Sequence, residues 1–180
     1  MARNIEIKAR ISSIEDLMHR AAKIADQGPI HIAQDDTFFH CAAGRLKLRQ
    51  FTEDSGELIF YQRADQSGPK ESFYIRSVTA EPASLRECLM LAYGQSGRVI
   101  KHRTLFLAGR TRIHLDRVES LGDFLELEVV LADGDAVDGG RREAEAVMRQ
   151  LEIEASQLIE TAYVDLLAAS STSPRSCVRS

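Results

Sequence analysis

Charged and apolar residues alternate along several short segments of this chain, and this alternation restricts the fold more than any other feature. The charged positions fall in five segments: Glu6, Lys8 and Arg10; Arg45, Lys47 and Arg49; Lys101 and Arg103; Arg110, Arg112, His114 and Asp116; Glu126 and Glu128. Successive side chains of a β-strand point to opposite faces, so each set lies on one strand face and apolar residues occupy the other. If one closed sheet contains these strands, the charges converge on one cavity. Clustered cations bind polyanions and clustered carboxylates bind divalent metals, so the pattern predicts a site for a metal-bound triphosphate.

The bulk composition is that of an ordinary globular domain with no general affinity for nucleic acid. The chain has 180 residues, of which 44% are hydrophobic and 28% are charged, and its net charge is −4. A chain of this length can bury a full core as one domain. Proteins that bind nucleic acid non-specifically are usually basic, so we expect no nucleic-acid partner, and the local clusters of cations matter more than the total.

The cysteines and the apolar runs favour a cytoplasmic location. Cys41, Cys88 and Cys177 are odd in number and far apart, and they form no C-x-x-C pair. This pattern predicts neither a disulfide framework nor a zinc site. Charged residues begin at Arg3, where a signal peptide would have an apolar region, and no apolar run reaches the roughly 20 residues that span a bilayer. We therefore expect no association with a membrane.

The periodicity predicts eight strands and several helices. The strands are expected at about 4–11, 30–40, 45–52, 57–63, 71–78, 98–107, 110–117 and 123–131. Helices are expected at about 13–26, 82–93, 141–151 and 155–168, the first with a capping box formed by Ser12 and Glu15. Eight strands joined mostly by short turns predict an α+β fold, a closed eight-stranded antiparallel β-barrel with helices packed outside. We expect residues 1–168 to form this domain and residues 169–180 to be a disordered tail.

Several segments resemble a known family in the right order along residues 3–168. The family's opening E-x-E-x-K motif is similar to residues 4–8, with Asn4 in place of the first Glu. Two basic strands match at Lys47 and Arg49 and at Lys101 and Arg103, and an acidic pair follows at positions 126 and 128. The chain thus resembles the CYTH superfamily of triphosphate tunnel metalloenzymes, which contains class IV adenylyl cyclases, thiamine triphosphatases and inorganic triphosphatases. It looks closest to the cyclase-like branch.

The resemblance implies a tunnel in which cations bind a triphosphate and carboxylates hold one or two Mg²⁺ or Mn²⁺ ions. The implied metal ligands are Glu6, Asp116, Glu126 and Glu128. The implied substrate-binding residues are Lys8, Lys47, Arg49, Arg63, Lys70, Lys101, Arg103 and Arg112. Lys8, Arg103 and Glu128 are the expected catalytic residues. Charge stabilisation is the main catalytic contribution in phosphoryl transfer, and this is the role expected of the cations.

Several alternatives stay open at the level of sequence. The reaction is either hydrolysis of a small triphosphate, such as tripolyphosphate or thiamine triphosphate, or cyclisation of ATP to cAMP and pyrophosphate. Asn4 lacks a carboxylate, which keeps a non-catalytic binder of nucleotide or polyphosphate in view. His114 is either an acid or base near pH 7 or a hydrogen-bonded barrel histidine, and Tyr61 either stacks on a substrate ring or packs in the barrel. The oligomeric state is open, a homodimer included.

Overall fold

The structure, a computed structural model, describes residues 2–63 and 69–172. Its strands are β1 (Ala2–Arg10), β2 (Gln27–Phe39), β3 (Arg45–Thr52), β4 (Ser55–Arg63), β5 (Lys70–Thr79), β6 (Gln95–Ala108), β7 (Thr111–Val118) and β8 (Gly122–Leu131). Its helices are α1 (Ile14–Ile24), α2 (Pro82–Tyr93), α3 (Val137–Gln150) and α4 (Tyr163–Thr172), with a short 3₁₀ turn, η1 (Ala155–Gln157).

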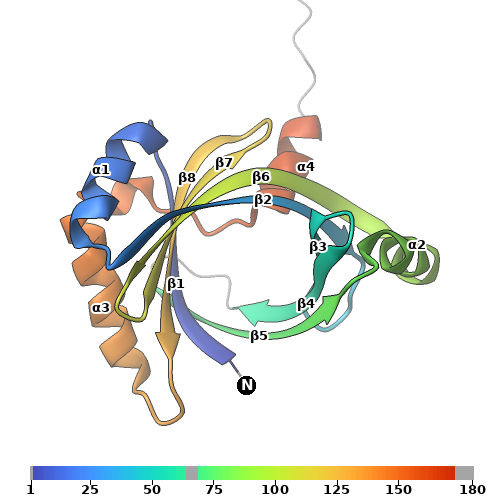
Figure 1. The fold of residues 1–180 in the computed structure, drawn as a ribbon, viewed down its shortest axis with the longest axis horizontal. Coiled ribbons are helices and arrows are strands. Elements are labelled where there is room, and N and C mark those ends of the chain that lie inside the picture. Colours follow the sequence, from blue (N-terminus) through green and yellow to red (C-terminus); the bar gives the residue numbers. More distant parts are fainter. Residues whose placement is uncertain (1, 64–68, 173–180) are drawn as a thin grey trace, which may run out of the picture.

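The eight strands form one closed antiparallel ring, with the order β1-β5-β4-β3-β2-β6-β7-β8 (Figure 1). β1 closes the ring because it pairs with β5 on one side and with β8 on the other. Antiparallel neighbours need only short turns, and closure leaves no sheet edge unpaired. The predicted α+β barrel is therefore confirmed.

The apolar faces of the strands point outward, and helices cover those of most strands, although Ile75 on β5 stays 54% exposed. α3 packs on β1 and β8, α1 packs on β6 and β7, and α2 packs on β2, β3 and β4. Figure 1 shows α1 and α3 on one side of the ring and α2 on the other. Ile5, Leu115, Leu125 and Leu127 have no exposed surface in the core beneath α1 and α3. Burying apolar surface on the outside of the ring leaves the charged faces to line its interior.

The chain after α3 differs from the predicted helix at 155–168. Ala9 and Leu158 form an isolated antiparallel bridge, and the amide of Ile159 donates to the carbonyl of Lys8. Residues whose backbones pair with β1 cannot also form helical hydrogen bonds. Only the turn η1 therefore forms before Leu158, and α4 begins at Tyr163.

Two helix boundaries also differ from the sequence prediction. The cap of α1 is Ser13, whose hydroxyl accepts from the amide of Asp16, and not Ser12. α4 continues to Thr172, so residues 169–172 are helical and the predicted disordered tail does not begin at position 169. The rest of that predicted tail, 173–180, lies outside the described residues.

None of the helices in the described parts of the chain has the length and apolar character needed to cross a membrane.

Candidate functional site

A cavity of about 310 Å³ occupies the interior of the ring. The strands contribute these charged lining residues: Glu6, Lys8, Asp36, Lys47, Arg49, Glu57, Arg76, Lys101, Arg103, Arg112, Glu126 and Glu128. Cations outnumber carboxylates among the described side chains of the lining. Eight of the β1, β3, β6 and β8 charges expected to converge on one cavity are thus found there, namely Glu6, Lys8, Lys47, Arg49, Lys101, Arg103, Glu126 and Glu128, whereas Arg10, Arg45 and Arg110 are not among its described lining residues. Arg63 and Lys70 pair through their backbones with Ser72 and Glu6, but their side chains lie outside what the structure describes.

A buried carboxylate joins the two cations of β3. Asp36 on β2, with 2% of its surface exposed, lies opposite Arg49 in the register of β2 and β3. Its Oδ2 accepts from Lys47 Nζ at 2.7 Å and from Arg49 Nη2 at 2.8 Å, and its Oδ1 accepts from Arg49 Nε at 2.7 Å. One carboxylate therefore holds a lysine and an arginine side by side at the cavity wall.

The same arrangement recurs two strands further around the ring. Asp116 on β7 is fully buried and lies opposite Arg103 on β6. It accepts from Lys101 Nζ at 2.7 Å, from Arg103 Nε at 2.6 Å and from Arg103 Nη2 at 2.7 Å. The hydroxyl of Tyr163 donates to Asp116 Oδ2 at 3.3 Å. The lumen thus has two Lys-x-Arg pairs, each held by an aspartate on a neighbouring strand. We call Lys47 and Arg49 the β3 pair, and Lys101 and Arg103 the β6 pair.

The two aspartates stay ionised because of their cations. Burial acts to raise the pKa of Asp36 and of Asp116, but the neighbouring Arg49 and Arg103, together with the lysines, hold both pKa values well below the usual range. Burial lowers the pKa of Lys47 to about 8, with a further contribution from the charge of Arg49, although Asp36 opposes the shift. Arg103 keeps its charge because Asp116 and Glu126 raise its pKa against the effect of burial. These charges are desolvated and held in place before any ligand arrives.

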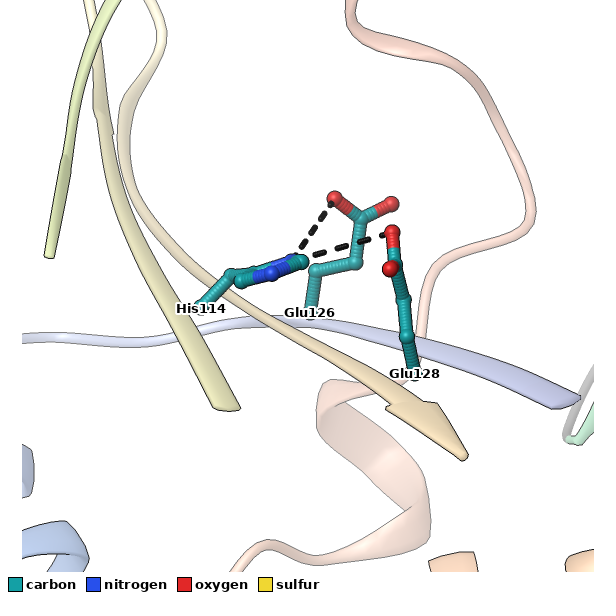
Figure 2. Close-up of side chains that lie close together, drawn as sticks. All are labelled: His114, Glu126 and Glu128. Atoms are coloured by element: carbon teal, nitrogen blue, oxygen red, sulfur yellow. Dashed lines mark ion pairs between the residues drawn. The ribbon is translucent and has the colours of Figure 1, made fainter. Parts of the chain in front are cut away.

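A second cluster lies on β7 and β8 and contains His114, Glu126 and Glu128 (Figure 2). His114 Nδ1 lies 3.9 Å from Glu126 Oε2 and 3.8 Å from Glu128 Oε1. His114 lies opposite Glu126 across β7 and β8, and the next pair on the same face of that ladder is Arg112 with Glu128. Burial, followed by the charge of Arg103, lowers the pKa of His114, so its ring is neutral at pH 7. A neutral imidazole and two carboxylates form a donor set that fits a divalent metal ion.

Cations surround this cluster and connect it to the β6 pair. Arg103 Nη2 donates to Glu126 Oε2 at 2.7 Å, Lys8 Nζ lies 3.6 Å from Glu126 Oε1, and Arg112 Nη1 lies 3.3 Å from Glu128 Oε2. Burial acts to raise the pKa of Glu126, but Lys8, Arg103 and Lys101 hold it well below the usual range. The Nζ of Lys8 also lies 4.1 Å from the ring centroid of Tyr163, near the start of α4. The tunnel therefore presents the ionised carboxylate of Glu126 directly beside fixed cations, with Glu128 as its neighbour on the same strand face.

The structure brings most of the predicted site residues together, and it places Asp116 differently from the prediction. Asp116 does not line the cavity, and both its oxygens are engaged by the β6 pair. Asp116 thus supports the β6 pair, and its role as a metal ligand stays a prediction. The sequence analysis did not single out Asp36. Gln34 and Asp36 are two residues apart on one strand, so the same alternation could have placed both on the lumen face. His114 was considered as an acid or base, or as a barrel histidine, and not as a member of a metal cluster.

The closed antiparallel ring and the charged residues of both signs in its lumen define a β-barrel protein with a charged tunnel. Comparisons with known proteins identify the family to which it belongs. The model of the CYTH domain matches residues 2–163. The curated adenylate cyclase CyaB of Aeromonas hydrophila is 22% identical over 175 residues, which cover 93% of this chain and 90% of that protein. The chain belongs to the CYTH family, whose members include triphosphatases and class IV adenylyl cyclases.

Solved structures share the fold. The PH1012 protein of Pyrococcus horikoshii OT3 has a TM-score of 0.80 at 22% identity, and the match covers 91% of this chain and 98% of the PH1012 chain. The Hippeastrum protein HpAC1, reported to have a dominant triphosphatase activity, has a TM-score of 0.64 at 14% identity, and the match covers 96% of this chain and 98% of HpAC1. At such identities the likeness establishes the tunnel architecture alone.

Proposed function

We propose that this protein is a divalent-metal-dependent enzyme that hydrolyses a small organic or inorganic triphosphate. The observation that carries the proposal is the coincidence, in one cavity, of two aspartate-fixed Lys-x-Arg pairs with the cluster of His114, Glu126 and Glu128. A chain of linked phosphates offers several anionic groups in a row, which suits two fixed cation pairs better than a monophosphate does. The cavity volume of about 310 Å³ fits a small ligand.

In this proposal the cations bind the phosphates and stabilise charge during the reaction. The β3 pair and the β6 pair bind separate phosphates through Lys47, Arg49, Lys101 and Arg103, with Arg112 nearby and Arg63 and Lys70 as further predicted contacts. Lys8 and Arg103 stabilise the negative charge that develops on the leaving group. Both are buried cations that Glu126 already holds in place in the cavity wall. Asp36 and Asp116 act as positioning residues, since they hold the pairs in one geometry.

The residues that fit a metal ion are Glu126 and Glu128, with Glu6 on the neighbouring strand β1 opposite Glu128. The fit is supported by the buried Nδ1 of His114, which has no hydrogen-bond partner although it faces both carboxylates. When bound, Mg²⁺ or Mn²⁺ would supply Lewis-acid stabilisation of phosphoryl oxygens. Asn4 offers only a neutral oxygen where the family motif has a carboxylate, so we propose a single tightly held ion.

Cyclisation of ATP is the second candidate, favoured by the likeness to the adenylate cyclase of Aeromonas hydrophila over nearly the whole chain. It requires the ribose 3′-hydroxyl to reach the α-phosphorus, whereas hydrolysis requires only an aligned water. The lumen offers fixed cations on several strands, and both reactions would use them, so the products distinguish the two reactions. We further propose a cytoplasmic location, as the cysteine pattern predicted.

The test is a panel of substrates with defined products. Tripolyphosphate, thiamine triphosphate, ATP and GTP are incubated with Mg²⁺ or Mn²⁺, and products are measured by phosphate release and chromatography. Release of orthophosphate supports the hydrolase, and cAMP with pyrophosphate supports the cyclase. Glu126→Gln keeps the side-chain shape but removes its charge, and it should lower kcat by about 10²–10³.

Exposed Glu87→Gln on α2 is the matched control and should retain full activity. Binding of tripolyphosphate without turnover of any substrate would replace the enzyme with a non-catalytic binder. Full activity of Glu126→Gln at limiting metal would contradict the proposed site.

A further inference from the structure

The Nδ1 atom of His114 is buried and has no hydrogen-bond partner. The side chain of His114 is 5% exposed, and the nearest carboxylate oxygens lie 3.8 and 3.9 Å from Nδ1, beyond hydrogen-bonding distance. Buried polar atoms in native proteins are nearly always paired, so an orphaned nitrogen on a cavity wall indicates a missing partner. Figure 2 shows the imidazole edge directed at the two carboxylates and not away from them.

The spacing of the three donors suits a metal ion between them. The donor atoms of His114, Glu126 and Glu128 all lie within 4.8 Å of one another. An octahedral ion with bonds of about 2.1 Å separates adjacent donors by about 3.0 Å and opposite donors by about 4.2 Å. The distances of 3.8 and 3.9 Å exceed the spacing of adjacent donors by less than about 1 Å, so small side-chain rotations would bring the three donors to one ion. Such an ion would give Nδ1 its missing partner and reduce the repulsion between the two carboxylates.

We infer that His114 is the third protein ligand of the metal, and that this nitrogen makes the site selective for a first-row transition ion, with Mn²⁺ as the reference, over Mg²⁺. The inference rests on the proposed metal dependence and deepens it. Mg²⁺ prefers oxygen donors, whereas imidazole binds transition ions better. Among the described residues that line the cavity, His114 is the only histidine, so the selectivity depends on one side chain.

The experiment measures metal binding directly and does not depend on activity. Chelator-treated protein is titrated with Mn²⁺, free Mn²⁺ is followed by its electron paramagnetic resonance signal, and Mg²⁺ is then added as a competitor. Pulsed resonance of bound Mn²⁺ detects whether a nitrogen nucleus is coordinated. We expect nitrogen modulation and preferential binding of Mn²⁺ in the wild type. His114→Gln, which substitutes a neutral oxygen donor, should lose the modulation and weaken Mn²⁺ binding by at least about tenfold, with a smaller effect on Mg²⁺.

Two further variants separate the inference from the function on which it rests. His102→Gln changes an exposed histidine of β6 and should leave both affinities unchanged. Glu128→Gln should weaken binding of both ions. Bound Mn²⁺ without nitrogen modulation in the wild type would overturn the role of His114 while leaving the carboxylate site in place, and this measurement stands even if His114→Gln does not fold. A wild type that binds neither ion would overturn both the inference and the proposed metal dependence.

Discussion

At the scale of single residues, two adjacent aspartates have opposite environments because they lie on one strand. Asp36 points into the tunnel and holds the β3 pair. Asp35 points outward and accepts from Arg98 at 2.7 and 2.8 Å and from Arg86 at 3.4 Å at the surface. Breaking a desolvated ion pair leaves uncompensated charge, whereas a solvated pair contributes little. The neighbours therefore form a matched pair for testing what the tunnel charges do.

Asp36→Asn should destabilise the protein by about 3–5 kcal/mol, because Lys47 and Arg49 lose their shared partner inside the protein. Asp35→Asn should cost only about 0–1 kcal/mol. Urea unfolding of both variants measures these free energies. Tripolyphosphate should then raise the melting temperature of Asp36→Asn more than that of the wild type, since the ligand supplies the missing negative charge. Equal destabilisation by the two substitutions would show that Asp36 is not the anchor of the β3 pair.

The pKa of Lys47, lowered to about 8, should make phosphate binding sensitive to mildly alkaline pH. Lys47 carries its charge below pH 8 and loses it above, so tripolyphosphate affinity should fall by roughly tenfold between pH 7 and pH 9. Calorimetric titration across this range measures the change. In Lys47→Arg the charge persists, so the decline should be shallower, and the ligand's own titration is common to both proteins. Parallel pH profiles would contradict the assigned role of Lys47.

At the scale of elements, α4 packs against β6 through a close approach at Gly97. A Cβ atom at Gly97 would overlap Cγ2 of Val164 on α4. Val164 belongs to the cluster that contains Phe38, Val99 and Tyr163, so the placement of α4 is linked to the tunnel wall. Glycine at this position is needed because it lets the helix approach the strand.

Gly97→Ala should destabilise the protein by about 1–3 kcal/mol, because the added methyl group overpacks this contact. Removing the opposing methyl groups in Gly97→Ala/Val164→Ala should recover part of the loss, beyond what additive effects allow. Gly139→Ala is the matched control: a Cβ there meets nothing within 4 Å, and alanine favours the helix α3. Thermal unfolding of the wild type, these variants and the single variant Val164→Ala tests this. A Gly97→Ala variant as stable as the wild type would contradict the close approach.

At the scale of the whole molecule, the buried charges should make stability fall in acid. The pKa of His114 is lowered, so below about pH 6.5 the unfolded chain takes up a proton that the folded chain does not. The pKa values of Asp36, Asp116 and Glu126 are also lowered, so stability present above about pH 4 is lost as pH falls further. Urea unfolding between pH 7.5 and pH 2.5 should show a shallow decline followed by a steep one. A free energy of unfolding that stays constant down to pH 3 would contradict the burial of these charges.

Local patterns predicted most of the fold and the positions of many tunnel residues. Lys47 and Arg49 were placed on the lumen face by alternation alone, because Cβ direction along a strand depends only on the local backbone. Ser13 and the start of α4 were missed. Ser12 and Ser13 are adjacent, and the prediction chose the wrong one of the two as the cap of α1. The helix predicted at 155–168 is shorter in the structure, because Leu158 pairs with Ala9, a residue distant in sequence.

The alternation of residues along each segment was enough to predict which side chains share a strand face, and hence that charges line a tunnel and apolar residues pack under helices. Which of these charges meet depends on how the strands are arranged in the fold. Asp36 joins the β3 pair, Asp116 joins the β6 pair, and His114 faces Glu126 and Glu128, because strand register and ring closure bring those positions within contact distance. Parity is a local property of each strand, whereas register, closure and the burial that shifts each pKa depend on the entire folded chain.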